Sequence, residues 1–144
     1  MRVFIVCMLC SIIFLSACSI PEEEIEQLSL NYWNKGVPSM VLYPEEDSKE
    51  IQLFMDAINN SKLLHDKVIM TEPLLSFNID LTDEKEKNYH LWILTNGEGY
   101  IQQLHPDENK TFQMDSSVAL DVHNYLKKQD DVELINIEIE FEKY

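Results

Sequence analysis

The segment PLLSFNIDLTDEKEKNYHLWIL, residues 73–94, carries the clearest indication of the fold class. Apolar residues occupy every second position from Leu75 to Leu81, a pattern that predicts a strand with one buried face. A charged run at residues 83–87 predicts a turn. Residues 89–95 then form a second strand that is apolar on both faces, which is typical of the centre of a sheet. The segment therefore predicts neighbouring strands in a largely antiparallel sheet, the second of them central.

The sequence on either side supplies the other elements. Period-two patterns predict strands at 28–32, 39–43, 99–104, 111–114 and 133–142. Helical spacing predicts helices at 48–62 and 116–128, with Asp47 and either Asp115 or Ser116 as N-caps. The 133–142 strand alternates most regularly, so one face should pack and the other should carry carboxylates in water. The predicted class is α+β, in the order β-β-α-β-β-β-β-α-β, with a mostly antiparallel sheet and both helices on one face.

The N-terminus carries a short apolar segment. Residues 3–15 are apolar apart from Ser11, which is the length of a signal-peptide core and short of the roughly 20 residues that span a bilayer. The sequence Leu15-Ser16-Ala17-Cys18 follows and resembles the lipobox of bacterial lipoprotein precursors. The resemblance implies diacylglycerol on Cys18 and cleavage between Ala17 and Cys18. Two acyl chains would make the lipid bilayer a stable partner, and the expected location is the outer face of the cytoplasmic membrane.

Cys7 and Cys10 offer a competing interpretation, because C-x-x-C spacing also occurs in metal and redox sites. Such sites need polar or electropositive surroundings that stabilise thiolates, whereas these two thiols lie in an apolar run that cleavage would remove. An unlipidated signal peptide and a retained membrane helix are further alternatives. The expected organisation is a signal peptide at 1–17, a lipidated cysteine and acidic tether at 18–27, and a single domain at 28–144.

The charge balance excludes several classes of ligand. Arg2 is the only arginine, so the chain from Cys18 onward has ten lysines against 26 acidic residues and a net charge of −16. Nucleic acid and anionic polymers should be repelled by such a chain. Three glycines, two of them in the turn Asn96-Gly97-Glu98-Gly99, leave no phosphate-binding loop. We therefore expect no cofactor and no nucleic acid partner.

Residues 28–128 resemble the YhfM-like domain of small Gram-positive lipoproteins. The matching features are SKEIQLFMDAINNSK, EPLLSFNIDL, YHLWI before a glycine turn, and a helix that begins near Ser116 after an aromatic-containing strand. The resemblance implies a lipid anchor and an α+β domain, and it carries over no catalytic residues. The family pattern tends to end near the second helix, so the strand expected at 133–142 is a departure from it.

Candidate chemistry centres on His90 and Trp92, which share one face of the central strand, with Tyr89 beside them. The pair could line a small-ligand pocket, or it could be a partly buried face with a hydrogen-bonded histidine. His65, His105 and His123 lack metal-ligand spacing, and the acidic turns lack a calcium-loop pattern, so no metal site is expected. The sequence has no G-x-S-x-G or S-x-x-K motif, and the only cysteine left after cleavage would be acylated, so no catalytic residue is expected.

These observations favour a non-enzymatic binding or interaction module at the cell envelope, with an envelope protein as partner. The tail strand and the region from Tyr89 to Trp92 are the expected contact surfaces. The alternative is a small-ligand receptor or envelope enzyme with a pocket near His90 and Trp92. A third hypothesis is weak sensing of divalent cations through the acidic turns.

Overall fold

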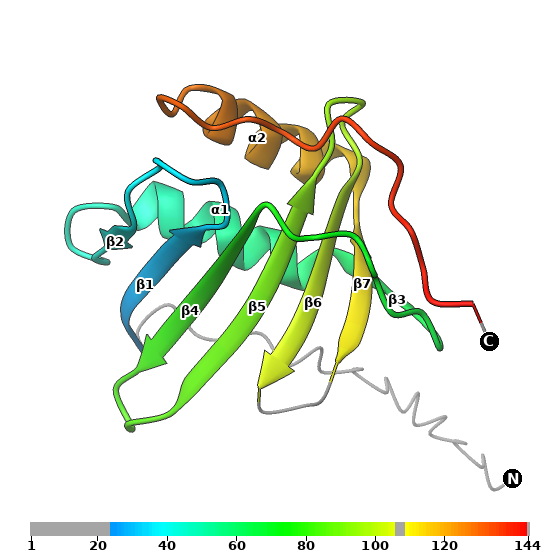
Figure 1. The fold of residues 1–144 in the computed structure, drawn as a ribbon. Helices are drawn as coiled ribbons and strands as arrows, with labels where there is room; N and C mark the ends of the chain where they lie inside the picture. Colours follow the sequence, from blue (N-terminus) through cyan, green and yellow to red (C-terminus); the bar gives the residue numbers. More distant parts are fainter. Residues whose placement is uncertain (1–23, 106–108, 144) are drawn as a thin grey trace, which may run out of the picture.

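The structure is a computed structural model that describes residues 24–105 and 109–143 (Figure 1). The helices are α1 Ser48–Asn59 and α2 Ser116–Lys127. The strands are β1 Ile25–Tyr32, β2 Met40–Leu42, β3 Ser61–Leu64, β4 Leu75–Leu81, β5 Glu86–Ile93, β6 Gly99–His105 and β7 Lys110–Met114. They form one sheet in the order β2-β1-β4-β5-β6-β7-β3, and every neighbouring pair is antiparallel.

The predicted α+β class is confirmed, with both helices on one face of an antiparallel sheet (Figure 1). The predicted central position of the strand that contains Trp92 is also confirmed, because β5 is the fourth of seven strands. Its two faces are both covered, which is why its sequence is apolar in succession rather than in alternation.

The helix-covered face carries the main core. Alternate residues of β4, including Phe77 and Ile79, are fully buried there beneath α1 and α2. Phe77 stacks on Tyr89 of β5 with ring centroids 4.9 Å apart, and Phe54 of α1 lies 5.3 Å from Phe77. The alternation of apolar residues in 75–81 therefore arises because one face of β4 packs against the helices.

Two predictions near α1 need correction. The helix ends at Asn59 rather than at residue 62, and Ser61–Leu64 pairs with β7 as the edge strand β3. The N–H of Asn60 bonds to the carbonyl of Asp56, and the Asn60 side-chain amide donates to the same oxygen. Asparagine competes in this way with helical backbone bonds, so the chain leaves the helix at this position.

The predicted strand at residues 133–142 is wrong. Only isolated bridges occur in this segment, a parallel one between Leu94 and Ile135 and an antiparallel one between Ile69 and Phe141. The segment crosses the helix-free side of the molecule and has no strand beside it along its length (Figure 1). The structure also starts the first strand at Ile25, inside the stretch expected to be tether.

The predicted signal peptide, the cleavage position and Cys18 fall in residues 1–23, outside the part of the chain that the structure describes. Within the described ranges, neither helix has the length and apolar character needed to cross a bilayer.

Candidate functional site

A second, smaller cluster of apolar side chains lies on the helix-free face of the sheet. Its buried members are Ile69, Trp92, Leu94 and Tyr100. The C-terminal tail, which we define as residues 132–143, adds Ile135, Ile139 and Phe141 to this cluster. The tail is thus held by Ile135, Ile139 and Phe141, but its backbone does not form a strand, and Ile137, which the alternation placed on the same packed face, is 60% exposed.

Backbone hydrogen bonds fix the tail at its two ends. Near its start, the N–H of Thr95 donates to the carbonyl of Ile135 at 2.8 Å, and the N–H of Ile135 donates to Ile93 at 3.1 Å. Near its end, the N–H of Met70 donates to Glu140 at 2.7 Å. Ile137, between these anchor points, is 60% exposed. The tail therefore spans the helix-free face with its middle portion free of the cluster.

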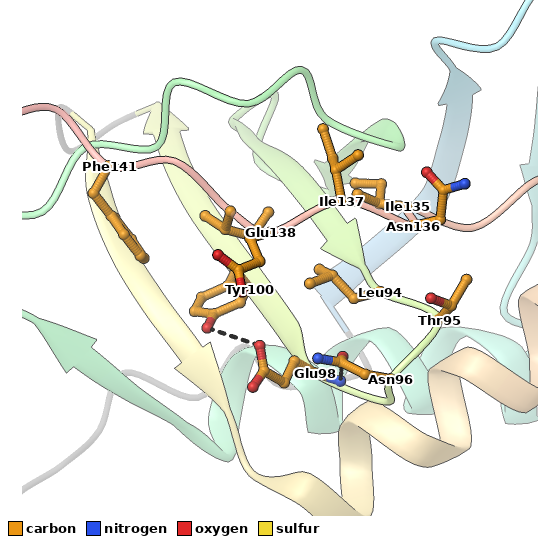
Figure 2. Close-up of a pocket in the computed structure, with 11 residues that line it drawn as sticks. Leu94, Thr95, Asn96, Glu98, Tyr100, Ile135, Asn136, Ile137, Glu138 and Phe141 are labelled. Carbon is orange, nitrogen blue, oxygen red and sulfur yellow. Dashed lines mark hydrogen bonds between the residues drawn. The ribbon is translucent and has the colours of Figure 1, made fainter.

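A pocket of about 360 Å³ lies under this span (Figure 2). Eleven residues line it: Leu94, Thr95, Asn96, Glu98, Tyr100, Ile135, Asn136, Ile137, Glu138, Ile139 and Phe141. We call this the tail pocket. One wall comes from the turn between β5 and β6 and the start of β6, and the other wall comes from the tail (Figure 2). Its volume lies within the range of small-molecule sites, which begins at about 300 Å³.

The β5–β6 turn determines where Glu98 lies. Gly97 has a φ of +91°, a conformation that residues with a side chain rarely adopt. The Asn96 side chain then accepts a 2.9 Å hydrogen bond from the N–H of Glu98, and the N–H of Leu94 donates to the carbonyl of Glu98 at 2.9 Å. The backbone that carries Glu98 is therefore held on both sides, and its exposed side chain lies at the pocket wall.

Tyr100 is the buried polar group of the tail pocket. Its hydroxyl donates to Glu98 Oε2 across 3.4 Å, and its ring meets that of Phe141 edge to face at 6.0 Å between centroids. Burial, followed by the charge of Glu98 and the hydrogen bond to it, raises the pKa of Tyr100. The hydroxyl therefore stays protonated at neutral pH, where it serves as a hydrogen-bond donor.

The residues singled out from the sequence do not converge on one site. His90 and Trp92 share the helix-free face, with ring centroids 5.9 Å apart, whereas Tyr89 lies on the helix-covered face against Phe77. Trp92 is 1% exposed, and its indole N–H donates to the carbonyl of Thr71 at 2.9 Å. Trp92 therefore supports the tail cluster and presents almost no surface to a ligand.

His90 is half-buried between two indole rings. Trp33 meets it edge to face at 5.4 Å from the other side and is itself 47% exposed. Burial lowers the pKa of His90, which favours the neutral imidazole at pH 7. An aromatic setting of this kind orients the ring but supplies no acid to pair with it.

No cluster of three or more histidine, cysteine, aspartate or glutamate side chains within residues 24–105 and 109–143 is arranged to hold a metal ion. His65, His105 and His123 lie in three different parts of the fold: after β3, at the end of β6 and in α2.

The fold and the pocket define a small α+β protein in which one sheet face carries two helices and the other carries a tail. A YhfM protein family match covers residues 22–131, and the chain belongs to that family. Comparisons with curated proteins and with solved structures gave no match. The matched region ends before the tail begins, so one wall of the tail pocket comes from inside the family region and the other from outside it.

The sequence did not predict Glu98 and Tyr100 as site residues. Glu98 lies in a turn motif whose residues are explained by backbone conformation alone. Tyr100 lies in a predicted strand, where an aromatic residue is common. The available signal was the alternation in the tail, which requires an apolar surface somewhere to receive Ile135 and Ile139. That signal does not specify which surface.

Proposed function

We propose that this chain is a lipid-anchored extracytoplasmic protein that acts as a non-enzymatic binding module on the outer face of the cytoplasmic membrane. Diacylglycerol on Cys18 would be its anchor, and residues 19–24 would be its tether. The lipobox-like Leu15-Ser16-Ala17-Cys18 after an apolar segment supports the anchor. Three glutamates at positions 22–24 suit a solvated tether.

The observation that carries the proposal is the position of the tail pocket relative to the start of the domain. β1 begins at Ile25, which pairs with Leu81 at the end of β4. β5 starts close to that end of the sheet and runs eight residues away from it, to Ile93. Eight residues of strand span about 26 Å. The tail pocket, lined by the β5–β6 turn, therefore lies at the opposite end of the sheet from Ile25.

This arrangement suits a binding module. A domain tethered through Ile25 presents its far end, with the tail pocket, away from the bilayer and toward the envelope. Confinement at the membrane raises the effective concentration of such a module near envelope partners. The polar groups of the pocket are two carboxylates, two amides, the Thr95 hydroxyl and a protonated tyrosine hydroxyl, which are groups suited to holding a ligand.

Replacement of Cys18 tests the anchor. In cells that express the full chain, the Cys18→Ala variant should leave the membrane fraction, because the acylated atom is gone. Cys10→Ala is the matched control, since it removes a thiol from the same region without touching the lipobox, and it should fractionate like the wild type. If Cys18→Ala stays in the membrane fraction, the proposed anchor is wrong.

A further inference from the structure

The tail pocket has an unbalanced charge. Glu98 and Glu138 contribute carboxylates from opposite walls, and none of the eleven lining residues is basic (Figure 2). Both glutamates are exposed at the surface. The chain as a whole carries a net charge of −15, which further attracts cations toward any open site. The electrostatics therefore favour a ligand with a positive charge.

The interior of the pocket is aromatic and aliphatic. Tyr100 and Phe141 present two rings set edge to face, 75° apart between their planes. Leu94, Ile135 and Ile139 supply the aliphatic part of the lining. Faces of aromatic rings attract cations through their quadrupoles, and the best known ligands of this kind are alkylated ammonium ions. The Lys67 ammonium, which is outside the pocket lining, lies 5.7 Å from the Phe141 ring centroid, so a bound cation would share that ring with it.

We infer that the tail pocket binds a small alkylammonium ion, with its charge held between Glu98 and Glu138 and its alkyl groups against Tyr100 and Phe141. This inference rests on the proposed binding role and names the ligand class. Such an ion combines the two properties that the lining requires, one positive charge and an apolar surface. A volume of about 360 Å³ admits a quaternary ammonium compound of a few carbons.

Other ligand classes match the lining less well. An anion would meet two carboxylates on opposite walls and no basic side chain among the eleven lining residues. Calcium takes six to eight oxygens, and the described residues form no metal-holding cluster. A neutral hydrophobic ligand would use the aliphatic and aromatic residues and leave Glu98 and Glu138 without a role.

Calorimetric titration of the full chain in non-ionic detergent micelles tests the inference. The probe is choline, and the control ligand is 3,3-dimethylbutan-1-ol, which has the same shape without the charge. Choline should bind, and it should bind at least about twofold to fivefold more tightly than the alcohol, the range expected for an exposed cation–π contact. Equal affinity of the two compounds, or binding of neither, would overturn the inference.

Variants locate the site. Glu98→Gln keeps the shape of the side chain and removes its charge, so choline affinity should fall by about twofold to fivefold while binding of the alcohol is unchanged. Glu72→Gln, an exposed position outside the pocket lining, is the matched control and should bind choline like the wild type. Tyr100→Phe keeps the ring and should retain choline binding. Unchanged affinity in Glu98→Gln would contradict the assignment.

A further titration separates a free ammonium compound from a lipid head group. Dihexanoylphosphatidylcholine, used below its micelle concentration and without detergent, carries the same ammonium group next to a phosphate. Glu98 and Glu138 should repel that phosphate, so this lipid should bind more weakly than choline. Tighter binding of the lipid would overturn the assignment to a free ion. Because none of these titrations depends on membrane anchoring, their failure would leave the Cys18 test unaffected, and the reverse also holds.

Discussion

Tyr32 shows how a single side chain couples the fold to pH. Its hydroxyl is buried without a hydrogen-bond partner, which is costly for a polar group. Burial, with a smaller effect from the nearby Tyr125, raises the pKa of Tyr32 from 10.0 to about 12. The unfolded chain therefore releases this proton at a lower pH than the folded chain. The associated stability is complete below pH 10 and is lost as the pH rises toward 12.

We predict that Tyr32→Phe stabilises the protein by about 1 kcal/mol at pH 7, because it removes an unsatisfied hydroxyl and keeps the ring. The variant should also lose part of the decline in stability above pH 10. Tyr100 and Tyr125 have pKa values that are raised as well, so some decline remains. Urea denaturation from pH 7 to pH 11 measures both effects. Tyr43→Phe, at a position 49% exposed, is the control, and a Tyr32→Phe variant that behaves like it would contradict the prediction.

At the scale of the element, the sequence predicted strands wherever one face is buried. Residues 75–81 alternate because Phe77 and Ile79 pack beneath the helices, and that cause leaves a direct signature in the sequence. β3 leaves little signature, because Ser61–Leu64 is short, lies at a sheet edge and depends on β7 for its hydrogen bonds. The tail gave the opposite error. Alternation reports that one face of a segment packs, and it does not report that a neighbouring strand supplies hydrogen bonds.

Two isoleucines of the tail, which a regular alternation would place on the same face, give a matched pair of variants. Ile139 packs on the helix-free cluster, whereas Ile137 is 60% exposed. Ile139→Ser should weaken tail docking and raise amide exchange at Met70 and Glu142 by about tenfold, because both amides donate to partners across the tail junction. Ile137→Ser should change neither rate.

Hydrogen exchange followed by NMR measures both variants against an internal reference. The Leu74 amide donates to Leu91 within the sheet and should stay protected in each variant. Equal exchange rates in the two variants at Met70 and Glu142 would show that the packing of Ile139 does not hold the tail.

For the whole molecule, the sequence predicted the class and the central strand, and it predicted the site only in part. His90 and Trp92 do share a face, as their spacing requires, but Trp92 is buried and its indole N–H is hydrogen-bonded to the carbonyl of Thr71. The tail pocket could not be read from the sequence because its walls lie about 40 residues apart in the chain and meet only through the tail's crossing of the sheet. Long-range contacts of this kind leave no local pattern.

The proposed function combines a lipid anchor at Cys18 with a ligand pocket at the end of the sheet away from Ile25. The acidic domain is not attracted to anionic membrane surfaces. Membrane attachment would therefore depend entirely on the acylation of Cys18. Without acylation, the pocket would not be held at the membrane.

Mass spectrometry of the N-terminal peptide of the protein isolated from membranes tests the proposed acylation of Cys18. We predict that the mature chain begins at Cys18 and that the mass of this residue is increased by a diacylglycerol group. A mature chain that begins at any other residue, or a Cys18 that carries an unmodified thiol, would contradict the account.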